Sequence, residues 1–351
     1  MPAERAPLVS RLSLILAVAA VVLATVWALR TAPYPNSDRY DYLARAWHLS
    51  EGQEPAPLVV YPLRFAFPEA ESLPARNLTR PPLWPAVLSS PRRSGVTDAA
   101  AVLGAALALG GIVFLLWRAT PEGYGGFAAL AAVSAFSVWR ALLGGGPELV
   151  LGLLLLVVWT WTGTPQRWTR IAVVGGLLGL MPWLHPVGWL YALLGLGSRL
   201  WREPAGTLVP AALLAVVIGL PWYTQAGTVT GEPLAPLQAH AELQKAIHDG
   251  GGLGPYRTLE PVTGREVVAG DPARFGRHLA HNLKEQLLHL DGWMAWPLVV
   301  LGLLGIRRDR WLAARDLLLL GVGFLVVSSI AFDPRLLTPL VPVAALWIGT
   351  G

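Results

Sequence analysis

The sequence predicts an all-α polytopic membrane protein with about ten transmembrane helices. Its 351 residues are 54% hydrophobic and only 14% charged, which excludes an ordinary soluble domain. Apolar runs of roughly 17–25 residues, the length that crosses a bilayer, recur along the whole chain. The short loops between these runs are rich in arginine. Together these features are typical of a protein that passes through the membrane many times.

The apolar runs give the predicted spans. The first follows Arg5 and Arg11 and lacks a small-residue cleavage site, so we expect an uncleaved span. Pro182 and Pro186 interrupt one long apolar stretch, where the chain either turns back or kinks. The predicted spans are residues 9–30, 97–117, 123–142, 147–163, 168–182, 183–198, 205–223, 291–306, 312–331 and 333–350.

Arginine distribution predicts the orientation. With the N-terminus in the cytoplasm, the short outer turns carry only Arg140 and Arg335. Every short inner loop carries at least one arginine, as the positive-inside rule requires. The formal charge of +5 therefore reflects membrane orientation and not a nucleic-acid partner. We expect a multi-pass protein of the bacterial inner (plasma) membrane. The inner arginines are Arg118, Arg167, Arg170, Arg199, Arg202, Arg307, Arg308, Arg310 and Arg315.

Two longer segments, residues 31–96 and 224–290, are predicted on the extracytoplasmic side of this single membrane domain, 1–351. Within the first, residues 38–51 have helical periodicity, with an N-cap at Ser37 or Asp38 and a stop at Gly52. The second contains an apolar stripe at helical spacing. Both segments are therefore expected to carry amphipathic helices at the membrane surface. The stripe consists of Phe275, Leu279, Leu283, Leu287 and Leu290.

Three short motifs lie at the outer ends of the spans. Asp38 and Tyr42 form a D-x-x-x-Y pattern, and Arg80 precedes Pro-Pro-Leu. Arg335 opens an R-x-L-x-P-x-x-P pattern. In this order, the motifs resemble those of the GT-C class of membrane glycosyltransferases, in particular bacterial relatives of the dolichyl-phosphate-mannose protein mannosyltransferases. The sequence departs from that pattern at Arg39, where many relatives have a second acid.

The resemblance implies a GT-C-like fold whose active face is extracytoplasmic. It implies transfer of a hexosyl or pentosyl group from a polyprenyl-phosphate donor to an acceptor that the sequence does not identify. Asp38 is the expected base, and Asp41 is the alternative catalytic carboxylate. Arg335, helped by Arg80, is expected to bind the donor phosphate, because guanidinium pairs with phosphate through two parallel hydrogen bonds. The simpler interpretations are that Asp38 caps a helix and Arg335 lies at the bilayer boundary.

Three further residues are candidates for binding the donor or its phosphate. Tyr42 belongs to the first motif. Glu148 follows a glycine-rich turn and starts a span. Its simpler interpretation is an acid that complements the dipole at a helix N-terminus. His185 stands in an apolar setting, where relatives often carry Lys or Arg and where a structural role is the alternative.

The sequence does not assign a metal site. The missing cysteines exclude thiolate ligands and disulfides. His278, His281 and Glu285 share one helical face, with His289 further on, but this spacing is also typical of a solvated helix face. Whether a divalent cation acts as cofactor stays open at this point.

Two other functions compete with the transferase. One is a catalytically silent GT-C-like subunit of a membrane assembly, and the other is a transporter of lipids or small molecules. Transporters usually place their polar groups near mid-bilayer, whereas here these groups gather at the ends of the spans.

Overall fold

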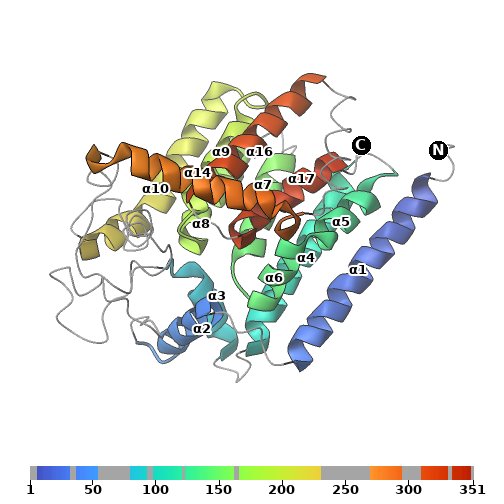
Figure 1. The fold of residues 1–351 in the computed structure, drawn as a ribbon, viewed down its shortest axis with the longest axis horizontal. Helices are drawn as coiled ribbons and strands as arrows, with labels where there is room; N and C mark the ends of the chain where they lie inside the picture. The colour runs from blue at the N-terminus through green and yellow to red at the C-terminus, as the bar shows by residue number, and fades with distance from the viewer. Residues whose placement is uncertain are drawn as a thin grey trace.

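The computed structural model describes residues 6–31, 37–53, 80–92, 98–120, 123–161, 166–230, 269–294, 310–330 and 334–348. These residues form helices joined by turns, as expected for an all-α protein (Figure 1). The first half of the described chain contains α1 (Ala6–Arg30), α2 (Ser37–Ser50), α3 (Leu83–Arg92), α4 (Asp98–Ala119), α5 (Gly125–Ser134), α6 (Phe136–Gly144) and α7 (Glu148–Thr160). The second half contains α8 (Arg167–Leu184), α9 (Gly188–Arg199), α10 (Ala205–Thr230), α14 (Pro272–Leu288), η4 (Leu290–Gly292), α16 (Arg310–Ile330), η6 (Pro334–Leu340) and α17 (Val341–Ile348).

Three of the described helices are long and apolar enough to cross a membrane. They contain Leu8–Arg30, Ala99–Ala119 and Ala205–Gln225, and they coincide with the first, second and seventh predicted spans. The bent pair α5–α6 makes four if it counts as one span. The predicted total of about ten is not confirmed. Helix α7 has 13 residues and α9 has 12, so each is roughly 20 Å long and shorter than the hydrocarbon core. The eighth predicted span lies mostly outside the described residues.

Two predicted spans differ in shape from the expectation of a continuous helix. The third is broken at Ala135, which has extended backbone, and its halves α5 and α6 meet at 66°. The tenth begins as the 3-10 segment η6 before it continues as α17. Pro339 and Pro342 explain why the tenth span does not begin as an α-helix, because proline cannot donate the backbone hydrogen bond that an α-helix requires.

At Pro182–Pro186 the chain turns back. Helix α8 ends at Leu184, and α9 begins at Gly188. Gly188 lies against Met181, and Gly195, two turns later, lies against Leu178. The later residue of α9 therefore contacts the earlier residue of α8, so the two helices run antiparallel and form a hairpin. Of the two alternatives that Pro182 and Pro186 allowed, the chain turns back and does not merely kink.

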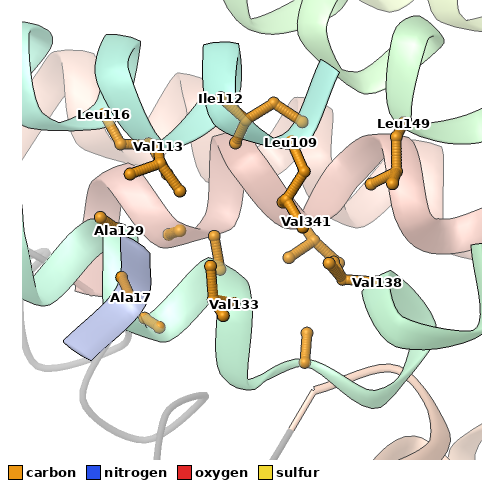
Figure 2. Packing of buried hydrophobic residues seen from close by; sticks show 14 of the residues in the cluster. Ala17, Leu109, Ile112, Val113, Leu116, Ala129, Val133, Val138, Leu149 and Val341 are labelled. Atoms are coloured by element: carbon orange, nitrogen blue, oxygen red, sulfur yellow. The ribbon is translucent and has the colours of Figure 1, made fainter. Parts of the chain in front are cut away.

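The core is built mainly from small and branched apolar side chains. Figure 2 shows how Leu109, Ile112 and Val113 of α4 pack with Val133 of α5 and Val341 of α17. Ala17 of α1 is fully buried against this cluster. The outward face of α1 is apolar, with Leu16 and Leu23 more than half exposed, as expected of a helix that faces lipid.

The helix bundle has two chemically different ends. Helix α7 begins at Glu148 and ends near Trp161, so these two residues mark ends that are roughly 20 Å apart. At the Trp161 end, Arg199 donates to the carbonyl oxygens of Val158 and Trp161. We call this the Arg199 end and the opposite one the Glu148 end.

Buried ion pairs hold the Arg199 end together. Glu203 pairs with Arg170 and Arg199, and Asp316 pairs with Arg202 at 2.6 Å. Burial tends to raise the pKa of Glu203, but hydrogen bonds from Arg170 and Arg199 outweigh it and lower that pKa. Several predicted inner arginines therefore do gather at one end, where they also link α8, α9 and α16 and satisfy the last carbonyls of α7.

The membrane orientation remains a prediction that cysteine labelling can check. The chain has no cysteine, so single substitutions report cleanly. Tyr40 on α2 and Trp168 on α8 are both exposed, at 41% and 73%. In intact cells a membrane-impermeant maleimide is expected to label Tyr40→Cys but not Trp168→Cys, which should react only after permeabilisation. External labelling of Trp168→Cys would reverse the orientation.

Candidate functional site

Asp41 is the centre of an ion-paired group near the Glu148 end. Its Oδ2 atom lies 3.1 Å from Nε of Arg45, one turn later on α2, and 3.0 Å from Nε of Arg80. Arg45 is almost fully buried, with 1% of its side chain exposed, and it also donates to the carbonyl of Arg80. Burial lowers the pKa of the Arg45 guanidinium, and the Asp41 carboxylate opposes that shift. Two arginines and one carboxylate leave the group with one net positive charge.

Tyr42 and Arg80 are in direct contact. The guanidinium carbon of Arg80 lies 5.2 Å from the centre of the Tyr42 ring, a cation–π geometry. Tyr42 is buried at 1% exposure and packs in a cluster that includes Trp84 and Leu184. The two motifs that contain Tyr42 and Arg80 therefore meet in space although a long stretch of sequence separates them.

Two hydrogen bonds dock α2 and α3 on the turn between α6 and α7. Arg39 donates to the carbonyl of Leu143 at 3.2 Å, and the Trp84 indole donates to the carbonyl of Gly145 at 3.0 Å. Gly145 ends α6 with φ +62°, a left-handed conformation that favours glycine. Arg39, which departs from the family pattern, therefore has a structural role in this chain.

Glu148 and His185 lie near this docking site. Glu148 is in the first turn of α7, at 6% exposure, and its carboxylate folds back beside Gly146. His185, at 9% exposure, follows the last residue of α8, and its Nδ1 lies 3.3 Å from the backbone nitrogen of Val187. The Val187 N–H donates to this Nδ1, so His185 stabilises the α8–α9 turn.

Tyr191 is a residue that sequence reasoning missed. Its fully buried hydroxyl donates to the carbonyl of Leu336, the residue after Arg335. The Glu148 carboxylate lies close enough to interact with the same hydroxyl electrostatically. Tyr191 thus bonds to the segment that carries Arg335 and lies within electrostatic range of Glu148. The available signal was a tyrosine one turn beyond the His185–Pro186 break, inside an otherwise apolar helix.

The structure therefore brings most of the predicted site residues to one end of the bundle. Asp41, Tyr42 and Arg80 form one contact group. Tyr191 bonds to the Arg335 segment, and Glu148 is near enough to Tyr191 for an electrostatic interaction. Leu184 belongs to the same buried cluster as Tyr42, which places His185 near the first group. Asp38 lies in the first turn of α2, one turn before Asp41, and its side chain is outside the described residues.

The second amphipathic helix, α14, packs on α16 and runs across the front of the view in Figure 1. Of the predicted apolar stripe, Leu290 is buried and Leu287 is half exposed, while the polar Asn282 and Gln286 are the buried residues within α14 itself. Asn282 donates to the carbonyl of Ser329 and contacts His278. Among the residues that the structure describes, no three His, Asp or Glu side chains are grouped as metal ligands.

The sequence matches no protein-family model and no curated protein. Among solved structures, the chain is similar to ArnT from Cupriavidus metallidurans bound to undecaprenyl phosphate, with a TM-score of 0.59. The two chains are 16% identical, and the match covers 95% of this chain and 59% of that chain. This chain thus spans somewhat more than half the length of ArnT. At this identity the likeness shows the fold alone.

Proposed function

We propose that this protein transfers a glycosyl group from a polyprenyl-phosphate donor to an acceptor at the extracytoplasmic face of the membrane. One observation carries the proposal: residues from positions 41, 80, 148, 185 and 335 gather at one end of a fold shared with ArnT. That solved structure contains undecaprenyl phosphate. A lipid phosphate at the membrane surface is an anion, and the net positive Asp41–Arg45–Arg80 group suits it electrostatically.

The reaction requires a base and a phosphate-binding group. An acceptor hydroxyl attacks the anomeric carbon of the donor, and the bond from that carbon to the phosphate oxygen breaks. The hydroxyl proton passes to the Asp38 carboxylate, while the bonding electrons leave with the polyprenyl phosphate. Arg335 and Arg80 stabilise the charge that develops on the departing phosphate.

In this scheme Asp41 positions arginines and is not the catalytic base, the role for which it was the alternative to Asp38. Its Oδ2 atom already pairs with Arg45 and Arg80, which suits a residue that holds arginines in place. We therefore assign proton acceptance to Asp38 and arginine positioning to Asp41. We assign contacts with the sugar or its phosphate to Glu148 and His185, which lie at the same end of the bundle.

The direct test uses purified protein in liposomes with synthetic undecaprenyl-phosphate monosaccharides, carrying either a pentose or a hexose. Undecaprenyl phosphate released in the presence of a lipid or sugar acceptor is the expected product. Binding is measured separately with undecaprenyl phosphate, and undecaprenol serves as the control that lacks the phosphate. Equal affinity for both lipids would contradict the phosphate-binding role of the arginines.

Replacing Arg335 by alanine is expected to weaken undecaprenyl phosphate binding about 10- to 100-fold, because hydrogen bonds to charged groups contribute roughly 1.5–3 kcal/mol. Arg335→Lys should recover only part of this loss, since an ammonium group cannot form two parallel bonds to phosphate. Arg315→Ala is the matched control, because Arg315 lies over Trp201 at the Arg199 end. Equal weakening by both alanine variants would refute a specific role for Arg335.

A further inference from the structure

The segment that carries Arg335 is held by three side-chain hydrogen bonds to three consecutive residues. The Tyr191 hydroxyl donates to the carbonyl of Leu336. The Trp293 indole donates to the carbonyl of Leu337 at 3.0 Å. Thr338 in turn donates to the carbonyl of Ser137 at 3.3 Å. The three partners come from α9, from the turn after η4 and from α6.

Pro339 explains why the segment needs an external donor. In a 3-10 helix the carbonyl of residue i accepts from the backbone N–H of residue i+3. For Leu336 that residue is Pro339, which has no N–H. The Tyr191 hydroxyl supplies the missing donor to this carbonyl. Leu336 is half-buried, so a donor within the protein satisfies its carbonyl where water has limited access, and the Tyr191 bond fixes the segment next to Arg335.

Trp293 is itself held in place on two sides. Its ring packs against Phe324 of α16 with 5.4 Å between the ring centres. Its backbone carbonyl accepts from the Ser137 hydroxyl at 3.1 Å. Ser137, Trp293, Leu337 and Thr338 therefore form a closed ring of side-chain and backbone contacts. Tyr191, at 0% exposure, is equally constrained by burial.

We propose that Tyr191 and Trp293 are positioning residues that set the location of the Arg335 guanidinium. The inference rests on the proposed function for its chemical purpose, because a fixed backbone lowers the entropy cost of the two-bond geometry between arginine and phosphate. Neither residue needs to touch the substrate. The R-x-L-x-P pattern thus depends on a tyrosine that lies 145 residues before Leu336.

A spin label tests the positioning without requiring activity. Arg335→Cys introduces a single cysteine into a chain that has none. We expect a nitroxide attached there to give a restricted spectrum in the parent and a more mobile one with Tyr191→Phe or Trp293→Phe. Ser198→Ala and Trp159→Phe are the controls, since each removes one buried side-chain hydrogen bond at the Arg199 end. Unchanged mobility in both test variants would overturn the proposal.

A double-mutant cycle tests the functional consequence. With Arg335 intact, Tyr191→Phe is expected to weaken undecaprenyl phosphate binding about fivefold, the effect of one ordinary hydrogen bond. In an Arg335→Ala background the same change should have little further effect, because Tyr191 acts through Arg335. Full additivity would show that Tyr191 acts by another route and would refute the inference. If the parent does not bind undecaprenyl phosphate, the proposed function fails, and the spin label still decides the positioning.

Discussion

Replacing Asp38 by asparagine is expected to abolish glycosyl transfer while leaving donor binding nearly intact. The substitution keeps the volume of the side chain but removes its capacity to accept a proton at neutral pH. A lost general base typically lowers the rate by about 10²–10⁴-fold. The measurement is single-turnover release of undecaprenyl phosphate, beside a binding titration with undecaprenyl phosphate on the same preparation.

Two comparisons make the Asp38 result specific. Asp38→Glu keeps the carboxylate but moves it, and partial activity is expected. Glu51→Gln removes an exposed carboxylate near the other end of the same helix and should leave transfer unchanged. Full activity of Asp38→Asn would remove Asp38 from the mechanism. A parent protein that binds the donor lipid but transfers no sugar would instead favour a catalytically silent subunit.

Replacing Asp41 by asparagine is expected to destabilise the protein by roughly 3 kcal/mol, a large effect for a single change near the membrane surface. Arg45 is 1% exposed and would keep a buried positive charge while losing its carboxylate partner. Asp41 itself is 16% exposed, and some screening by solvent moderates the loss. The readout is the thermal unfolding temperature of the purified protein in detergent.

The Asp41 prediction has an internal control in the double variant Asp41→Asn with Arg45→Met. Removing both charges eliminates the unpaired guanidinium, so much of the stability should return. Activity should stay low in this variant, because Arg80 would still lack the carboxylate that lies 3.0 Å from its Nε. If the double variant is no more stable than Asp41→Asn alone, the ion pair is not the source of the destabilisation.

The sequence predicted the individual helices better than their shapes. The helix expected at 38–51 is α2, and Gly52 after it has the positive φ of a glycine stop. Such features depend on neighbouring residues alone, through caps and periodicity. No proline or glycine stands at the break at Ala135, so the local sequence does not predict it. Its extended backbone is set by the packing of α5 and α6 on different neighbours, namely α1 and η6 among others.

For the candidate site, the sequence proposed individual residues but not how they pair. The three motifs identified Tyr42, Arg80 and Arg335, because short patterns record residue type and order. Asp41 was only the alternative catalytic carboxylate, and its ion pairs with Arg45 and Arg80 could not be predicted from the motifs. The motifs did not contain Tyr191, since its partner Leu336 contributes only a backbone carbonyl, and any residue type provides one.

By itself, the sequence determined that the described chain is all-α, where three of its long apolar helices lie and which arginines gather at the Arg199 end. Hydrophobic length and charge act over one helix or one loop, so they can be read locally. Only the tertiary structure decided that α8 and α9 form a hairpin, that Asp41 joins Arg45 to Arg80, and that Tyr191 supports the segment of Arg335. These contacts depend on how helices far apart in the chain pack together, because burial removes water as a partner and leaves each polar group to find one in another element.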